Sequence, residues 1–210
     1  MNLLAPGRLP FQAALALQEN LVADVLEGRA EETLILLEHE PVYTIGRTRD
    51  HSSLREALPH PVFETNRGGQ ATFHGPGQLV GYPILDLNKR GRDLHRYLRF
   101  LEEFLIEFSA TWRVAAERRE GLTGVWVGER KLASLGVGVR RWISMHGFAI
   151  NVTSESTQPF AHITPCGLAG VEMTSLSRES GVEISMAEAT ERAAFLFQDR
   201  ISKLNETHTL

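Results

Sequence analysis

The spacing of apolar side chains predicts three amphipathic helices. Apolar residues recur every three or four positions from Leu9 to Leu26, and again from residue 94 to residue 108. A third stripe is predicted over Ser185–Leu204, where a serine followed three residues later by a glutamate forms a capping-box pattern. Each helix therefore has one face that must be buried against another layer of structure.

Between these helices, short runs of β-forming residues predict strands. TLILLEH at 33–39 is a continuous apolar run, and the stretch 61–87 alternates β-rich pieces with glycine-rich turns. GVWVG, KLASLGVGV and ISMHGFAINV, over residues 124–152, are separated only by short charged turns and predict antiparallel neighbours. Because strands and helices do not alternate regularly, we expect an α/β (α+β) fold with a mixed, largely antiparallel sheet and packed helices.

Composition narrows the class of protein. The 210 residues show no repeat and no linker-like shift in composition, so we expect a single domain over 1–210. Twenty-two basic and 26 acidic residues give a net charge of −4, which argues against a nucleic-acid partner. No apolar run is long enough to span a bilayer and the N-terminus lacks a signal-peptide pattern, so we expect a cytoplasmic protein with no membrane partner.

The stretch RGGQATFHGPGQLVGYP at 67–83 is the richest in candidate chemistry. Its five glycines would allow the backbone to approach a ligand closely, and His74 lies among them. The alternative is a long glycine-rich hairpin connection. The pattern does not match a phosphate-binding loop, and GVGV at 136–139 does not continue into a dinucleotide-binding motif.

One cysteine and one lysine form the second candidate. Cys166 is the only cysteine, and Pro165 and Gly167 on either side predict a turn in place of a core position. Lys131 begins an otherwise apolar predicted strand. A nearby ammonium would favour the thiolate of the cysteine and could shuttle a proton. An unreactive thiol and an ordinary turn lysine remain the alternatives. The eight histidines form no metal-binding pattern, so we expect no metal.

Four stretches in this order identify the chain as similar to the lipoyl(octanoyl) transferases. They are EHEPVYTIGR, NRGGQATFHGPGQLVGYPILDL, GVWVGERKLASLGVGVRRWISMHGFAINV and ITPCGLAGVEMTSL, between Glu38 and Leu176. The resemblance implies a fold of the biotin/lipoate protein ligase type, related to the class II aminoacyl-tRNA synthetase core. It implies transfer of an octanoyl or lipoyl group from acyl carrier protein to a lysine of a lipoyl domain, without a cofactor. The implied acceptors are the lipoyl domains of 2-oxoacid dehydrogenase complexes and the glycine cleavage H protein.

The resemblance also implies roles for particular residues. Cys166 would carry the acyl group as a thioester, and Lys131 would lower the pKa of that cysteine. The implied substrate contacts are Arg67, Gly68, Gly69, Gln70, Ala71, Thr72, Phe73, His74, Ser134, Leu135, Gly136, Gly147, Phe148 and Ala149. Asn66 stands where the resemblance leads us to expect an acidic residue before Arg67-Gly68-Gly69, and this departure puts one local contact in doubt.

Other functions remain open at this point. An ATP-dependent lipoate or biotin ligase could share the fold, but it would form an acyl-adenylate and need no nucleophilic cysteine. A non-catalytic module that binds acyl carrier protein would need a pocket without a paired cysteine and lysine. A thioesterase would discharge the same intermediate to water. Arg140, Arg141 and Arg130, expected to be neighbours, are candidates for docking an acidic carrier protein.

Overall fold

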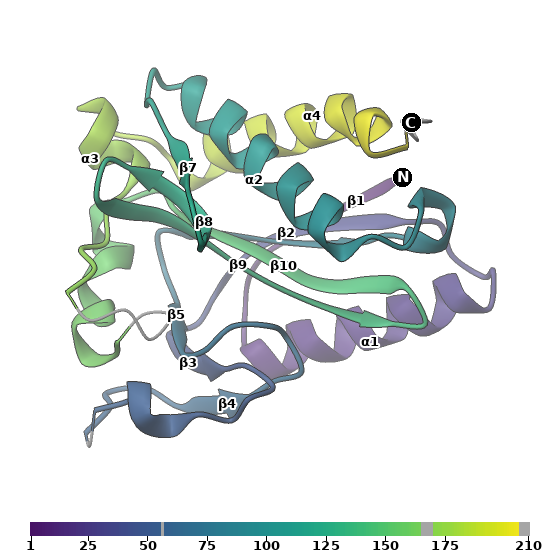
Figure 1. The fold of residues 1–210 in the computed structure, drawn as a ribbon, viewed down its shortest axis with the longest axis horizontal. Helices are drawn as coiled ribbons and strands as arrows, with labels where there is room; N and C mark the ends of the chain where they lie inside the picture. Colours follow the sequence, from purple (N-terminus) through teal and green to yellow (C-terminus); the bar gives the residue numbers. More distant parts are fainter. Residues whose placement is uncertain (56, 165–169, 206–210) are drawn as a thin grey trace.

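The protein has three layers, with one central sheet between helices. The computed structural model describes residues 1–55, 57–164 and 170–205. Helix α1 (Phe11–Leu26) covers one face of the sheet, whereas α2 (Leu94–Ala110) and α4 (Met186–Asn205) lie side by side on the other (Figure 1). This arrangement buries the apolar stripe of each predicted helix against the sheet.

The central sheet has seven strands in the order β1-β2-β6-β10-β9-β8-β7. Only the pair β1–β2 is parallel, and the other neighbouring strands are antiparallel. The sheet is therefore mixed and largely antiparallel, and the predicted fold class is confirmed. The bounds are β1 Asn2–Leu9, β2 Thr33–His39, β6 Gln78–Ile84, β7 Glu117–Arg119, β8 Leu122–Val127, β9 Arg130–Arg140 and β10 Ile143–Asn151.

A small second sheet extends beyond one end of α1. Its order is β4 (Val62–Glu64), β3 (Val42–Ile45) and β5 (Thr72–His74). A 3₁₀ segment, η3 (Ser154–His162), contacts β5. The remaining short helices are η1 (His51–Ser53), η2 (Leu87–Arg90) and α3 (Leu176–Ser180). The glycine-rich stretch 67–83 therefore leaves the small sheet through β5 and enters the large one as β6.

Three predicted helices and the predicted strands at 33–39 and 124–152 are confirmed with small shifts at their ends. The hydroxyl of Ser185 accepts a hydrogen bond from the backbone N–H of Glu188 (3.2 Å), as the capping pattern predicts. Strand β1 was not predicted from the sequence. This strand contains Pro6 and Gly7 and is almost wholly exposed at the edge of the sheet, so it carries no alternating apolar pattern.

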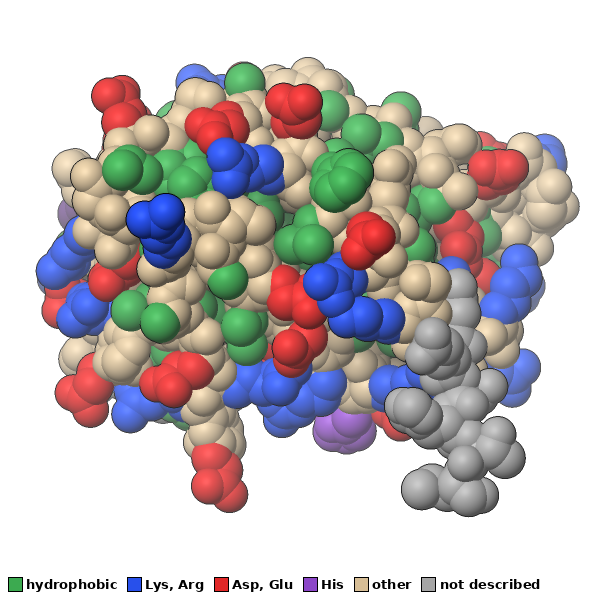
Figure 2. All heavy atoms as spheres, turned by 90° about the horizontal axis from the view of Figure 1, so that it is seen from above, with side chains coloured by type: hydrophobic (Ala, Val, Ile, Leu, Met, Phe, Trp, Pro, Cys, Tyr) green, Lys and Arg blue, Asp and Glu red, His purple; other side chains and the backbone are tan. Residues whose placement is uncertain are grey.

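The outer surface of α2 and α4 is charged and mixed in sign. Figure 2 shows this side of the molecule with acidic and basic side chains interspersed among isolated apolar ones. Ion pairs tie some of these charges together, including Arg200 with Glu107 (2.9 Å) and Arg192 with Glu188 (2.7 Å). No described helix is both long enough and apolar enough to cross a bilayer.

Candidate active site

The candidate site is a trough in the face of the sheet that points toward α1. Ser134 of β9 lies opposite Ala149 of β10, and Gly136 lies opposite Gly147. Opposed residues of an antiparallel pair share the same face, so four small residues, two of them glycines without a side chain, lie together here. Their size leaves a hollow where larger residues would fill the space.

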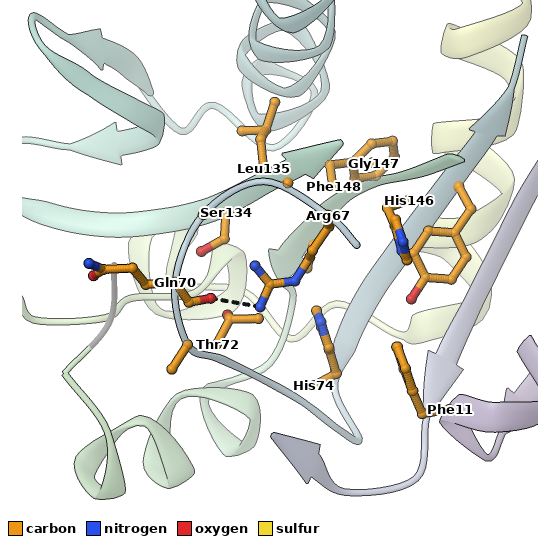
Figure 3. A pocket seen from close by; sticks show the side chains of 15 residues that line it. Phe11, Arg67, Gln70, Thr72, His74, Ser134, Leu135, His146, Gly147 and Phe148 are labelled. Atoms are coloured by element: carbon orange, nitrogen blue, oxygen red, sulfur yellow. Dashed lines mark hydrogen bonds between the residues drawn. The ribbon is translucent and has the colours of Figure 1, made fainter. Parts of the chain in front are cut away.

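Larger side chains close this hollow on the β6 side. Val80 of β6 lies directly across from Ala149, and Tyr82 lies two residues further along the same strand. Phe11, the first residue of α1, lines the same end of the pocket. In Figure 3, Phe11 and His146 lie on the opposite side of the pocket from Gln70 and Ser134.

A loop from Arg67 to Thr72 forms the roof of the pocket. The guanidinium of Arg67 donates hydrogen bonds to the carbonyl oxygens of Thr44 (2.7 Å), Gly68 (2.9 Å) and Gln70 (2.8 Å). A Cβ on Gly136 would lie 2.9 Å from the carbonyl oxygen of Gly68. Glycine at this position therefore allows the roof to close directly over β9.

Twelve of the fourteen predicted substrate contacts line this pocket: Arg67, Gly69, Gln70, Ala71, Thr72, His74, Ser134, Leu135, Gly136, Gly147, Phe148 and Ala149. Gly68 instead lines a neighbouring hollow beside α2, and Phe73 packs in the apolar cluster of the small sheet. The pocket is also lined by three residues that were not predicted from the sequence: Phe11, Tyr82 and His146.

Two buried histidines, His74 and His146, line the pocket, and a third, His39, packs against His74; burial keeps all three neutral. Burial lowers the pKa of His39 to about 4, and burial together with the charge of Arg67 lowers the pKa of His146 to about 4. Burial, followed by the nearby His39, holds the pKa of His74 well below its usual range. Neutral imidazoles allow the pocket to accept an uncharged chain without placing additional cations beside it.

Each histidine is held by named partners. His39 donates to the carbonyl oxygen of Leu9 (3.1 Å), and the hydroxyl of Tyr82 lies 2.7 Å from its other ring nitrogen. His74 donates from Nδ1 to Gln78 (2.8 Å). His146 donates from Nε2 to Oδ1 of Asn66 (2.6 Å), which gives the residue that departs from the related pattern a structural contact. The wall of the pocket is therefore a rigid polar network.

Two polar atoms on the pocket wall are not satisfied in this way. Oγ1 of Thr72 and Oε1 of Gln70 are buried, and neither has a hydrogen-bond partner within the described part of the chain. A buried polar group without a partner costs about 1–3 kcal/mol. These atoms are therefore available to a polar group of a bound molecule.

Lys131 lies on the same sheet face as Ser134, although the two are three positions apart and strict alternation would place them on opposite faces. The register shifts between β8 and β9, because Val125 pairs with Ala133 and Trp126 with Lys131. Leu132 is the extra residue of this β-bulge, which turns Lys131 to the face that carries the trough. The side chain of Lys131 is only 1% exposed. It does not itself line the pocket.

Cys166, the predicted nucleophile, lies outside the described residues. The described segments on either side of it lie close to the pocket and to Lys131. Ile163 and Met173 pack in one apolar cluster with Ala71 and Phe73, next to the roof of the pocket. Beyond the end of β10, the backbone around Met173 pairs with Lys131, whose N–H donates to Glu172 (2.8 Å). The described segment that follows Cys166 in the chain, Glu172–Thr174, is thus hydrogen-bonded to the backbone of Lys131.

The predicted grouping of Arg130 with Arg140 and Arg141 is wrong. Arg130 begins β9 and Arg140 ends it, so the length of the strand separates them. Arg130 also forms a two-bond ion pair with Glu179 (2.8 and 2.9 Å). The sequence spacing suggested one patch because the turns at both ends of a long hairpin are charged. Among the described residues, no cluster of His, Cys, Asp or Glu could hold a metal ion.

Comparisons with solved structures place this architecture in a known class. The fold matches lipoate-protein ligase A bound with ATP at a TM-score of 0.76, with 13% identity, covering 96% of this chain and 85% of that one. It also matches a biotin protein ligase from Aquifex aeolicus in complex with biotin and ATP (TM-score 0.60, 14% identity, 98% and 72% covered). The predicted ligase-type fold is confirmed.

Sequence comparison narrows the class further. Residues 10–198 match the family described as lipoyl protein ligase A/B catalytic domain. The octanoyltransferase of Geobacter sulfurreducens is 56% identical over 94% of this chain and 83% of its own length. That of Gloeobacter violaceus is 45% identical over 92% and 87%. The chain belongs to the octanoyltransferase family.

Proposed function

We propose that this protein transfers an octanoyl group from acyl carrier protein to a lysine of lipoyl domains, by way of a thioester on Cys166. The proposed acceptors are the lipoyl domains of 2-oxoacid dehydrogenase complexes and the glycine cleavage H protein. The observation that carries the proposal is a closed trough of small residues on the sheet face to which the bulge turns Lys131. Membership in the octanoyltransferase family supports the same activity.

The size of the trough supports an acyl chain of medium length. From β9 to β6 it crosses two strand spacings, or about 10 Å, before Tyr82 of β6 closes it. An extended eight-carbon chain, with C–C bonds of about 1.5 Å set in a zigzag, is about 9 Å long. The substrate contacts proposed for the Arg67–His74 loop and for Ser134–Gly136 and Gly147–Ala149 agree with this placement, except for Gly68 and Phe73.

In the first half-reaction, the thiolate of Cys166 attacks the carbonyl carbon of the carrier-bound thioester. The bond from that carbon to the carrier's sulfur breaks, and the ammonium of Lys131 gives its proton to the departing sulfur. In the second half-reaction, the neutral amine of the acceptor lysine attacks the new thioester. The attacking nitrogen loses a proton to Lys131, and Cys166 leaves as a thiolate. No ATP is consumed, because an amide is more stable than the thioester it replaces.

An intact-mass experiment tests this proposal directly. Octanoyl carrier protein alone, without ATP, should add one octanoyl group to the wild-type protein, and peptide mapping should locate it on Cys166. An unmodified lipoyl domain should then remove the group and gain an amide. Cys166→Ser should form no adduct at neutral pH, because a hydroxyl is a much weaker nucleophile.

The same experiment separates the alternatives. A requirement for ATP would indicate a ligase that shares the fold, binding without an adduct would indicate a non-catalytic module, and release of free octanoate with the acceptor present would indicate a thioesterase. Direct attack by the acceptor lysine would give transfer without any adduct. Each of these results would contradict the two-step mechanism.

A further inference from the structure

Lys131 lies in a compact seat made by the neighbouring strand β8. A Cβ on Gly124 would lie 2.8 Å from Cε of Lys131 and 3.3 Å from its Nζ. Real Cβ atoms do not approach other heavy atoms this closely, so any side chain at position 124 would displace the end of the lysine. A glycine inside a strand is usually unfavourable, and a close approach is one of its few uses. The space above Gly124 is therefore occupied by the lysine itself.

Trp126 forms a second wall of the seat. Nζ of Lys131 lies 5.3 Å from the centroid of the indole ring, within the range of a cation–π contact. The tryptophan is fully buried, and its ring N–H has no hydrogen-bond partner in the described part of the chain. Because the indole N–H has no partner there, hydrogen bonding does not explain a tryptophan at this position. The contact between the face of its ring and the ammonium of Lys131 does.

Helix α2 anchors the floor of this seat. The backbone N–H of Gly124 donates to the carboxylate of Glu102 (3.2 Å), which is 1% exposed. Glu102 in turn forms ion pairs with Arg99 (2.6 Å) and Arg118 (3.2 Å). Near the other end of the seat, Glu179 pairs with Arg130 (2.8 Å), and the guanidinium of Arg119 lies 5.3 Å from the centroid of the Trp126 ring. The backbone of Gly124 is therefore fixed from the side of the packed core.

We propose that Gly124 and Trp126 are positioning residues that hold the ammonium of Lys131 in one place against β8. Gly124 sets how deeply the side chain lies against β8, and the indole ring limits its sideways movement. A lysine side chain has four rotatable bonds and can adopt many conformations. Holding it in one of them removes the entropic cost of reaching the reactive conformation at each turnover. This inference rests on the proposed function, in which Lys131 stabilises the thiolate and moves the proton.

The first test uses Gly124→Ala with Gly128→Ala as its matched control. Both glycines have positive φ (136° and 56°), but a Cβ on Gly128, in the turn that follows β8, would meet nothing within 4 Å. Because Cys166 is the only cysteine, alkylation by iodoacetamide across pH reports its thiolate without further mutation. We expect Gly124→Ala to move the midpoint of this profile upward by about one pH unit and to slow single-turnover acylation at pH 7 roughly 10- to 100-fold.

Gly128→Ala should reproduce the wild-type alkylation profile and acylate within twofold of the wild-type rate. An unchanged profile in a folded Gly124→Ala protein would overturn the inference, and so would an equal shift in both variants. Gly124→Ala also brings its Cβ within 2.8 Å of the carbonyl oxygen of Ala133 and can fail to fold for that reason.

Trp126 therefore supplies an independent test. Trp126→Phe retains a ring beside the ammonium and should keep acylation within about threefold, whereas Trp126→Leu removes it and should shift the alkylation midpoint upward and slow acylation at least tenfold. Equal profiles for the two variants would contradict the role of the ring.

Lys131→Ala separates this inference from the proposed function on which it rests. If Lys131→Ala shifts the alkylation profile while Trp126→Leu does not, the positioning role of Trp126 is wrong but the proposed role of Lys131 stands. If Lys131→Ala leaves the profile unchanged, the proposed role of the lysine is wrong as well.

Discussion

The two faces of the central sheet come from alternate residues of the same strands, yet they are filled very differently. Toward α2 and α4, Leu135 of β9 and Phe148 and Ile150 of β10 pack with Phe104 and Phe197 in the large core cluster. Toward α1, the intervening positions of β9 and β10 carry serine, glycine and alanine. Both faces are buried, but the pocket lined by most of the predicted substrate contacts lies over the second.

This difference shows how one element can provide stability and a binding site together. The packed face supplies the free energy of folding, since large apolar side chains and aromatic contacts such as Phe104–Phe197 (5.1 Å between ring centroids) fill it. The opposite face gives up some of that free energy at four small positions. The pocket over this face is also lined by the neutral histidines His74 and His146 and by two unsatisfied polar atoms, of Gln70 and Thr72. Four changes would test this division of roles.

Lys131→Ala should have the largest effect on the site face. We expect the rate of octanoyl transfer to fall by about two to four orders of magnitude at neutral pH, because the proton shuttle is lost. The free energy of unfolding should change far less, which urea unfolding would measure alongside single-turnover acylation. Normal transfer by the variant would mean that the lysine is structural only.

Phe104→Ala should give the largest effect on the packed face. Phe104 is 1% exposed and contacts Phe108, Phe148 and Phe197. Its loss should reduce the free energy of unfolding by about 3–5 kcal/mol. The preference among butyryl, hexanoyl and octanoyl donors should remain that of the wild type, measured at a temperature where the variant is folded. A changed preference would show that the two faces are not independent.

Ala149→Leu should fill the trough. Transfer of an octanoyl group should slow about 100-fold, while a butyryl donor, which needs less of the trough, should lose less than fivefold; such a loss corresponds to roughly the binding of several methylene groups. Ile150→Val, one residue along β10 on the packed face, is the matched control. It should cost about 0.5–1.5 kcal/mol of stability without altering the order of donors. Equal losses for both donors would place the acyl chain elsewhere.

Lower pH should weaken the site face first. His39 and His146 have pKa values near 4 in the folded protein, compared with about 6.5 in an unfolded chain. The unfolded state therefore binds protons first as the pH falls, and stability that is complete above about 6.5 is lost progressively toward 4. Each histidine should lower the free energy of unfolding by about 2 kcal/mol at pH 5. Urea unfolding at pH 7.5 and 5.0, with NMR titration of the imidazoles, would measure both quantities. Imidazoles that titrate near 6.5 would contradict this prediction.

The sequence by itself determined the elements of this protein and much of its candidate site. The helices and most strands follow from local periodicity, which depends only on neighbouring residues. The glycine-rich stretch and the KLASLG segment could be selected because glycines and an isolated lysine are conspicuous in apolar surroundings. Membership in the octanoyltransferase family, predicted from four motifs, is confirmed. The roles of Cys166 and Lys131 stay predictions.

Only the tertiary structure decided which of these residues share the pocket. Phe11, Tyr82 and His146 come from α1, β6 and β10, and no local signal connects an aromatic residue at the start of a helix with a trough between distant strands. A conspicuous motif also contains residues that serve only packing, as Phe73 does.

The direction of Lys131 was decided in the same way. Strict alternation along β9 would place it on the opposite face from Ser134, and a single bulge at Leu132 reverses that result. Whether a strand forms depends on its own residues. Which face each residue takes, and what lies against it, depends on how neighbouring strands pair, because one extra residue in a ladder exchanges the two faces.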